Sequence, residues 1–339
     1  MMHELIEIMQ QAFFNQQKGL KNVLATVVHL QGSSYRKPGV RMLISDDFKT
    51  VGAVSGGCVE KEIIQQAKSV FNDSVAKVFT YDGRYRLGCE GTLYILLEPF
   101  VIKDSFLSEF VTANSNRETL QIVSYFKKAD VVCGNFGSII TFTNNQQFSF
   151  TDAFILPKKN SLDVFRQVVQ PAFKLIIIGA EHDAVKLCKI ASTLGWQIQV
   201  ITSAKDSKKL IDFPGATSVV RESPETIQFK EINLNCAIII MNHSYVQDLK
   251  YVLQLQHFQT KYIGILGAPK RRERLFNDLL ERVPEISEAF LETIYAPAGL
   301  HIGAQTPEEI AVSIIAEILA VTRNKEPFYL KNLNGKMNY

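Results

Sequence analysis

The residue best placed to do chemistry is Cys58, in the segment Val54–Glu62, which reads VSGGCVEKE. The Ser-Gly-Gly run is a turn signal, and the stretch that follows, up to Phe71, has helical spacing. We therefore expect Cys58 in or just before the first turn of a helix, where free N–H groups and the helix dipole favour the reactive thiolate. Gly56 and Gly57 leave room for a ligand near the backbone. The alternative is a small buried cysteine that packs a tight turn.

Two further loops carry groups that could contact a ligand. Cys89 lies in a second glycine loop, LGCEG, and Ser34, Arg36 and Arg41 lie in or beside the segment QGSSYRKPGV. Arginine clusters suit phosphate recognition. If both glycine-cysteine loops face one cleft, two thiols and an arginine share a site. Exposed arginines beside turn serines are the alternative.

A glycine-rich turn follows an apolar strand in the second half of the chain. Gly179 and Ala184 fit the outer positions of the dinucleotide-binding pattern G-x-G-x-x-G/A, but Glu181 replaces the middle glycine. A glutamate there places bulk and negative charge where a pyrophosphate would bind. The next strand ends at Thr202 without the acid that would contact a ribose. The pattern therefore predicts a Rossmann-like fold and makes NAD(P) binding doubtful.

Other candidate ligand contacts lie near the ends of predicted strands. His182 starts the helix after the glycine turn, His243 follows a buried strand, Gly267 precedes a basic run, and His301 lies between two glycines. Open α/β sheets bind ligands at the carboxyl ends of their strands. Solvated surface residues are the alternative for each of them.

Hydrophobic patterning indicates two different halves. The first half mixes a helix at residues 4–17 with strands at 23–30, 41–45, 50–54 and within 119–150, the last of these antiparallel. The second half alternates apolar strands with helices, which predicts a doubly wound parallel sheet. Its last helix starts with Thr306-Pro307-Glu308-Glu309, the pattern of a capping box. The expected fold class is thus α/β, with a mixed α+β N-terminal domain and a Rossmann-like C-terminal domain.

The domain limits follow from a polar stretch with two prolines near the middle of the chain. We expect an N-terminal domain over residues 1–155, a linker over 156–171, a C-terminal domain over 172–325 and a tail over 326–339.

Composition excludes several classes of protein. A net charge of +3 over 339 residues gives no reason to expect nucleic-acid binding. No apolar run reaches the length of a membrane span, and the N-terminus lacks the features of a secretory signal. The five cysteines include no C-x-x-C pair, so neither a metal site nor a disulfide framework is predicted. We expect a cytoplasmic protein that contacts no membrane.

Several motifs in order resemble the XdhC/CoxI family of xanthine dehydrogenase accessory proteins. They are GSSYRKPGVRML, VGAVSGGCVEKEI, LGCEGTLYILLEP, LIIIGAEHDA, YIGILGAPKRRERL and APAGLHIGAQTPEEIAVSIIAEILAV. The family usually has Gly at the positions of Glu90 and Glu181, and an acid at the position of Thr202.

The resemblance implies an N-terminal XdhC domain, a Rossmann-like C-terminal domain and a role as a non-catalytic maturation factor. Such a factor binds molybdenum cofactor (molybdopterin), supports its sulfuration and delivers it to a molybdenum hydroxylase client. A cysteine desulfurase partner and a homodimer are implied in the same way. Cys58, Gly56 and Gly57 match the family's first glycine-cysteine motif.

The alternative function is that of an NAD(P)-dependent oxidoreductase that uses the Rossmann-like domain. The altered glycine pattern and the missing ribose acid weigh against it.

Overall fold

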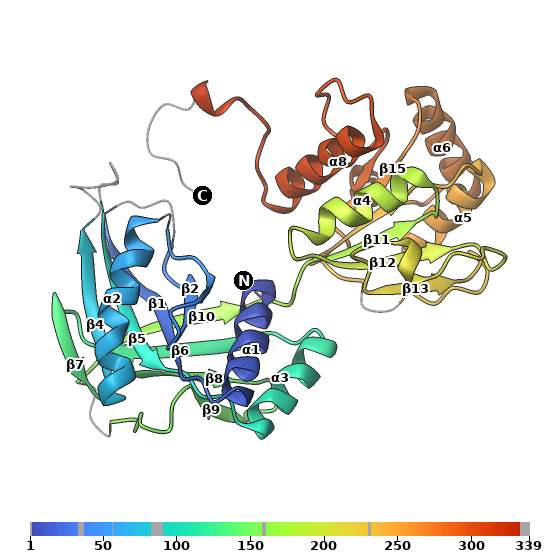
Figure 1. Ribbon diagram of the computed structural model, residues 1–339. Helices are drawn as coiled ribbons and strands as arrows, with labels where there is room; N and C mark the ends of the chain where they lie inside the picture. The colour runs from blue at the N-terminus through green and yellow to red at the C-terminus, as the bar shows by residue number, and fades with distance from the viewer. Residues whose placement is uncertain are drawn as a thin grey trace. The chain divides into compact units, whose positions relative to one another are not determined.

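The protein is described here by a computed structural model, which covers residues 2–32, 37–55, 57–82, 91–157, 161–229 and 232–332 (Figure 1). Its contacts divide the chain between Pro171 and Ala172 into two compact units. We call them the N-terminal unit and the C-terminal unit.

The N-terminal unit consists of two antiparallel sheets and three helices. Sheet A has the strand order β3-β2-β1-β5-β4-β7, and sheet B has the order β10-β6-β8-β9. The elements are α1 (Met2–Gln17), β1 (Asn22–Gln31), β2 (Arg41–Ser45), β3 (Thr50–Gly52), α2 (Cys58–Asp73), β4 (Ala76–Asp82), β5 (Thr92–Pro99), α3 (Asp104–Ser115), β6 (Leu120–Phe126), β7 (Val131–Gly134), β8 (Gly137–Thr141), β9 (Gln147–Ser149) and β10 (Asp163–Val169).

Helix α2 covers one face of sheet A. Its apolar stripe, which contains Val59, Ile63 and Ala67, is fully buried against residues of the sheet such as Val27 and Ile95. The other face of sheet A packs on sheet B through a second cluster that includes Val28, Val78, Leu96 and Phe126. Sheet A is therefore the middle layer of the unit, and both of its faces are apolar.

A buried polar chain links the two sheets. Glu98 on β5 is fully buried and accepts hydrogen bonds from the backbone N–H of Ser138 (2.8 Å) and from its hydroxyl (2.6 Å). The Ser138 hydroxyl lies 2.8 Å from the Ser124 hydroxyl on β6. Burial raises the pKa of Glu98 to about 7, because these hydrogen bonds and the Arg41 charge offset only part of the desolvation.

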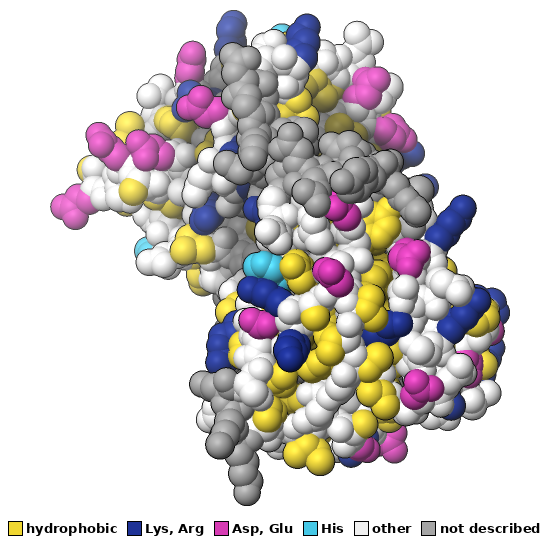
Figure 2. All heavy atoms as spheres, turned by 90° about the vertical axis from the view of Figure 1, so that its left-hand side faces the viewer, with side chains coloured by type: hydrophobic (Ala, Val, Ile, Leu, Met, Phe, Trp, Pro, Cys, Tyr) yellow, Lys and Arg dark blue, Asp and Glu magenta, His cyan; other side chains and the backbone are white. Residues whose placement is uncertain are grey.

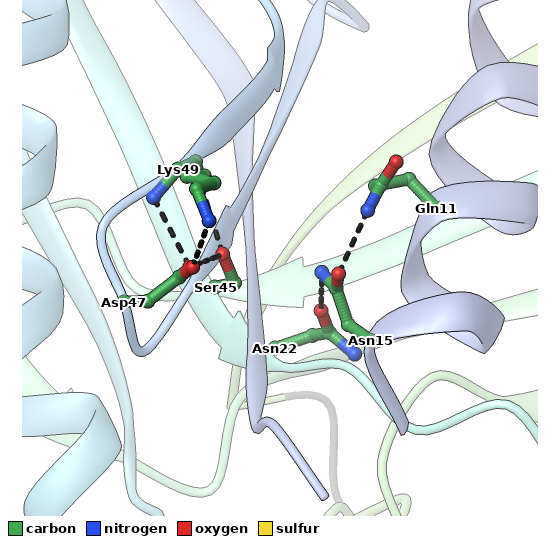
Figure 3. A network of polar contacts seen from close by, with 6 residues as sticks. All are labelled: Gln11, Asn15, Asn22, Ser45, Asp47 and Lys49. Carbon is green, nitrogen blue, oxygen red and sulfur yellow. Dashed lines mark hydrogen bonds and ion pairs between the residues drawn. The ribbon is translucent and has the colours of Figure 1, made fainter. Parts of the chain in front are cut away.

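Helix α1 is fastened to the start of β1 by amide side chains (Figure 3). The buried Asn15 accepts from Gln11 and donates to the Asn22 oxygen, both at 2.8 Å. Asn22 in turn donates to the Ala12 carbonyl at 3.0 Å. Figure 3 also shows the Lys49–Asp47 ion pair of the β2–β3 turn, whose lysine is well exposed.

The segment that we expected to be a linker contains a strand. Residues 163–169 form β10, which pairs with β6 along its whole length, from Asp163 opposite Phe126 to Val169 opposite Leu120. Within the expected linker at 156–171, these seven residues form an edge strand of sheet B, along which more exposed and less exposed side chains alternate.

The C-terminal unit has the expected doubly wound architecture. Six parallel strands follow the order β13-β12-β11-β14-β15-β16. The chain adds strands on one side of β11 first and then, from β14 onward, on its other side. The elements are β11 (Lys174–Ile178), α4 (His182–Ser192), β12 (Gln197–Thr202), the short 3₁₀ helix η2 (Leu210–Asp212), β13 (Ser218–Arg221), β14 (Cys236–Ile240), α5 (Tyr245–Leu255), β15 (Tyr262–Ile265), α6 (Pro269–Arg282), α7 (Glu288–Glu292), β16 (Ile294–Tyr295), α8 (Pro307–Thr322) and the 3₁₀ helix η3 (Leu330–Asn332).

Helices cover both faces of the parallel sheet. Helices α4 and α8 pack on one face and α5, α6 and α7 on the other. The predicted capping box of α8 is confirmed: Thr306 accepts from the Glu309 N–H, and the Glu309 carboxylate accepts from the Thr306 N–H. At the N-terminal ends of β11 and β12, the Phe173 and Trp196 rings lie 4.8 Å apart.

The charge on the surface and the hydropathy of the helices are consistent with the composition of the chain. On the face drawn in Figure 2, basic and acidic side chains are interspersed, and neither sign dominates. Among the described helices, none has both the length and the hydropathy that crossing a bilayer requires.

We expect Asn15→Ala to lower the free energy of unfolding by about 1–3 kcal/mol, because the buried Asn22 oxygen loses its donor. Thermal unfolding followed by circular dichroism measures the change. The matched control is Lys49→Ala, which removes an exposed ion pair from the same sheet and should leave the unfolding transition almost unchanged. Equal effects of the two variants would contradict this account of the α1–β1 contact.

Glu98 should make stability depend on pH. The folded protein keeps the Glu98 proton up to about pH 7, whereas the unfolded chain releases it near the ordinary pKa of 4.5. Between these values the folded state binds more protons, so the free energy of unfolding should fall as the pH rises and level off above pH 7. Glu98→Gln should flatten this slope, as urea titrations at several pH values can measure. Parallel pH profiles for the two proteins would show that Glu98 does not titrate in this range.

Candidate functional site

The strand register brings the flanks of two candidate loops to one end of sheet A. Strand β1 ends at Gln31, opposite Thr92 at the start of β5. Thr92 also lies opposite Asp82, the last residue of β4. The segment that follows β1 and the segment that joins β4 to β5 therefore leave from the same end. We call it the loop end of sheet A.

Helix α2 begins at this same end. Strand β3, which precedes it, ends at Gly52, opposite Met42 near the start of β2. The helix then runs back along the sheet, and its Phe71 carbonyl accepts a hydrogen bond from Lys21, just before β1. Cys58, the first residue of α2, is thus at the loop end, and its predicted place in the first helical turn is confirmed.

Residues at the start of α2 stabilise the turn that precedes the helix. Gly57 is the N-cap, and its φ of 85° favours glycine. The Glu60 carboxylate in the first turn accepts the Ser55 N–H at 2.6 Å. Within the described part of the chain, no side chain caps the first turn, where helix N–H groups lack partners within the helix. Tyr81, near the end of β4, is packed beneath α2, and its buried hydroxyl has no hydrogen-bond partner among the described residues.

Four of the candidate residues, Ser34, Arg36, Gly56 and Cys89, lie outside the described residues, as does the side chain of Cys58. Their roles stay predictions.

Arg41 lies on the other face of sheet A from α2. Its neighbour Met42 packs in the cluster beneath α2, and side chains alternate along a strand, so Arg41 points toward the layer between the sheets. It is only 7% exposed and donates to the Gly39 carbonyl (3.0 Å) and to the Gln167 side chain (2.6 Å). Burial lowers its pKa to about 10. This arginine fixes the segment before β2 to strand β10 and is not open to a ligand at the protein surface.

The C-terminal unit has a cavity of about 460 Å³ at the carboxyl ends of β11, β12, β13 and β14. It lies where the strand order reverses, which is the usual ligand position in such sheets. Of the predicted residues, Gly179 and His243 line it. A Cβ atom at Gly179, whose φ is 140°, would lie 2.8 Å from the Met241 carbonyl oxygen, so the turn requires glycine.

The other C-terminal candidates lie elsewhere. His182 is the first residue of α4 but does not line the cavity. Gly267 borders a separate hollow of about 10 Å³, which is large enough only for a water molecule. His301 is exposed, in a loop that the Gly299 N–H attaches to Glu317 on α8 at 2.8 Å. The structure does not bring these three residues together with His243.

Sequence reasoning missed three polar residues of the cavity. Asp206, Glu222 and the Tyr251 ring all line it. Glu222 directly follows β13, and Asp206 lies in the loop after β12. Their places after strand ends were a usable signal, but neither belongs to a short motif.

An ion pair between α5 and α6 lies next to the part of the cavity that follows β14. Arg271 on α6 contacts the Asp248 carboxylate and lies 3.4 Å from the Asn242 carbonyl oxygen, which it approaches as a donor. Burial raises the pKa of Asp248 to about 6, although the Arg271 charge opposes this shift. The pair links the start of α5 to the start of α6.

Two family profiles match the chain and together span more than half of it. The profile described as the XdhC and CoxI family matches residues 16–82, and that of the XdhC Rossmann domain matches residues 175–318. The first includes the start of α2, and the second spans the parallel sheet.

Known proteins resemble nearly the whole chain. A probable xanthine dehydrogenase subunit of Bacillus subtilis is 28% identical over 88% of this chain and 92% of its own. The molybdenum cofactor insertion chaperone PaoD of Escherichia coli is 22% identical over 90% and 84%. A crystal structure of a xanthine dehydrogenase from Bacillus halodurans superposes with a TM-score of 0.75 at 25% identity, covering 94% of this chain and 96% of the other. This chain therefore belongs to the XdhC and CoxI family.

Proposed function

We propose that this protein binds molybdenum cofactor at the loop end of sheet A and delivers it to a xanthine dehydrogenase-type hydroxylase. The observation that carries the proposal is the register of β1, β4 and β5, which gathers the flanks of two candidate loops beside the first residue of α2, Cys58. The name of the PaoD relative supports molybdenum cofactor as the cargo.

The groups at the loop end suit a phosphorylated ligand that carries a metal. The uncapped N–H groups in the first turn of α2 can receive a phosphate, and the Gly57 N-cap keeps the approach open. A cysteine sulfur such as that of Cys58 is a ligand for soft metals. When bound, the cofactor supplies the molybdenum chemistry of the client enzyme. The chain's own part is to hold it and to release it.

The wider role follows the family. Sulfuration of the cofactor with a cysteine desulfurase, a homodimeric state and a cytoplasmic location are part of the same proposal. The first two rest on the resemblance to the family, and the location rests on the cysteine pattern.

An NAD(P)-dependent oxidoreductase is the second candidate. The cavity at the switch point of the parallel sheet favours it. Glu181, which lines that cavity, weighs against a pyrophosphate there. A titration with NAD, included in the experiment of the next subsection, separates the two candidates.

Cys58→Ser should reduce the cofactor that is retained after purification at least tenfold, because the proposed sulfur contact is lost. The protein is co-expressed with cofactor biosynthesis, and molybdenum and oxidised pterin are measured per chain. Cys133→Ser, which replaces an exposed cysteine on β7, is the matched control and should retain the full amount. Normal loading of a folded Cys58→Ser protein would refute a binding role for Cys58.

Limited alkylation should modify Cys58 first. The start of a helix favours a thiolate, whereas Cys188 and Cys236 are buried and burial raises the pKa of Cys188 to about 11. We expect the order Cys58, then Cys133, then the two buried thiols with limiting iodoacetamide at neutral pH, read by peptide mapping. If Cys58 reacts after Cys188, it is a packing residue.

A further inference from the structure

The cavity of the C-terminal unit has a negatively charged lining, which is unfavourable for the phosphate groups of a nucleotide. Three carboxylates line it, those of Glu181, Asp206 and Glu222, and the described lining residues include no lysine or arginine. The neighbouring His243 is the one lining side chain among them that can become a cation. Such a lining repels phosphate groups but can accept hydrogen bonds from neutral hydroxyl groups.

Charged side chains of the chain itself lie beside the glycine turn. Glu181 is the N-cap of α4. The Lys208 ammonium donates to the Ala180 carbonyl and lies 4.0 Å from the Glu181 carboxylate. The Arg221 guanidinium holds Lys208 in place by donating to its carbonyl at 2.7 and 3.2 Å. Glu181 and Lys208 thus lie next to each other at the glycine turn, and the Glu181 carboxylate would repel a phosphate there.

The wall of the cavity formed by residues 222–224 is linked to α5 by hydrogen bonds and by an ion pair of the adjacent Glu225. The Tyr251 hydroxyl donates to the Glu222 carbonyl at 3.3 Å, and Gln254 contacts the Pro224 carbonyl. Lys250 pairs with Glu225 at 2.5 Å. These three contacts, all from the second half of α5, fix the segment that carries the Glu222 carboxylate.

This wall offers groups for a sugar and a base. Asp206 uses one carboxylate oxygen to accept the Lys208 N–H at 2.8 Å, which orients the side chain. The Glu222 carboxylate is half-buried at the cavity. Carboxylates bind the adjacent hydroxyls of a ribose in Rossmann folds. The Tyr251 ring and Pro224 add apolar surface for a flat base.

We propose that the cavity binds a ribonucleoside through its 2′- and 3′-hydroxyls, at Asp206 and Glu222, with no phosphate at the glycine turn. This site is separate from the proposed cofactor site of the N-terminal unit, and neither proposal depends on the other. Its ligand class is a neutral ribonucleoside, and a nucleotide with an intact diphosphate is selected against.

The test is calorimetric titration of the full chain with adenosine, cytidine, 2′,3′-dideoxyadenosine, ADP and NAD. We expect at least one ribonucleoside to bind. The dideoxy analogue should bind at least tenfold more weakly than adenosine, because the carboxylates lose their hydroxyl partners. ADP and NAD should also bind at least tenfold more weakly, because of repulsion at the turn.

Two variants assign these effects to residues. Glu222→Gln should weaken ribonucleoside binding at least tenfold, whereas the matched surface change Glu281→Gln on α6 should not alter it. Glu181→Gly should raise the affinity for ADP at least tenfold, because it removes the charge and frees Lys208 for a phosphate.

Three results would overturn the proposal. They are NAD or ADP binding to the parent protein as tightly as adenosine, equal affinity for the dideoxy analogue, and no binding of either ribonucleoside at millimolar concentration. Tight NAD binding would at the same time favour the oxidoreductase alternative. None of these results bears on the retention of molybdenum by the N-terminal unit.

Discussion

The antiparallel register of β1, β5 and β4 is the constraint on which the N-terminal unit depends. Once Thr92 lies opposite both Gln31 and Asp82, the ends of three strands are fixed together. A shift by one residue would turn every apolar side chain to the wrong face of a sheet that is buried on both sides. The same register therefore secures the core and gathers the loop flanks beside α2.

Both faces of sheet A are buried, so each polar side chain on them needs hydrogen-bond partners. This requirement explains where the polar residues of the sheet lie. The face beneath α2 is almost wholly apolar. The face toward sheet B contains Arg41 and Glu98, each with hydrogen-bond partners from another element. A buried polar or charged side chain needs such partners. The two residues thus fix how the layers pack.

Local patterns in the sequence predicted the elements that carry their own signals. The continuous apolar runs of β11 and β14 and the capping box of α8 were sufficient to predict the parallel sheet and its last helix. Strand β10 was missed because residues 163–169 do not alternate polar and apolar types, and its partner strand β6 is distant in sequence.

Some site residues could be predicted from the neighbouring sequence, whereas others depend on contacts with distant parts of the chain. The place of Cys58 followed from the turn and helix pattern around it. The burial of Arg41 could not be predicted, because it depends on Gln167, which a distant strand provides. Asp206 and Glu222 come from separate loops, and only the order of the parallel strands brings them to one cavity.

The packing of Phe173 on Trp196 has a practical consequence for spectroscopy. Trp196 is the sole tryptophan of the sequence and lies in the C-terminal unit, at the end of the sheet opposite the cavity. Emission excited through indole therefore reports on the parallel sheet alone, whereas far-ultraviolet dichroism reports on both units. A difference between the two optical melting curves would reveal, without any label, whether the halves of the chain unfold separately.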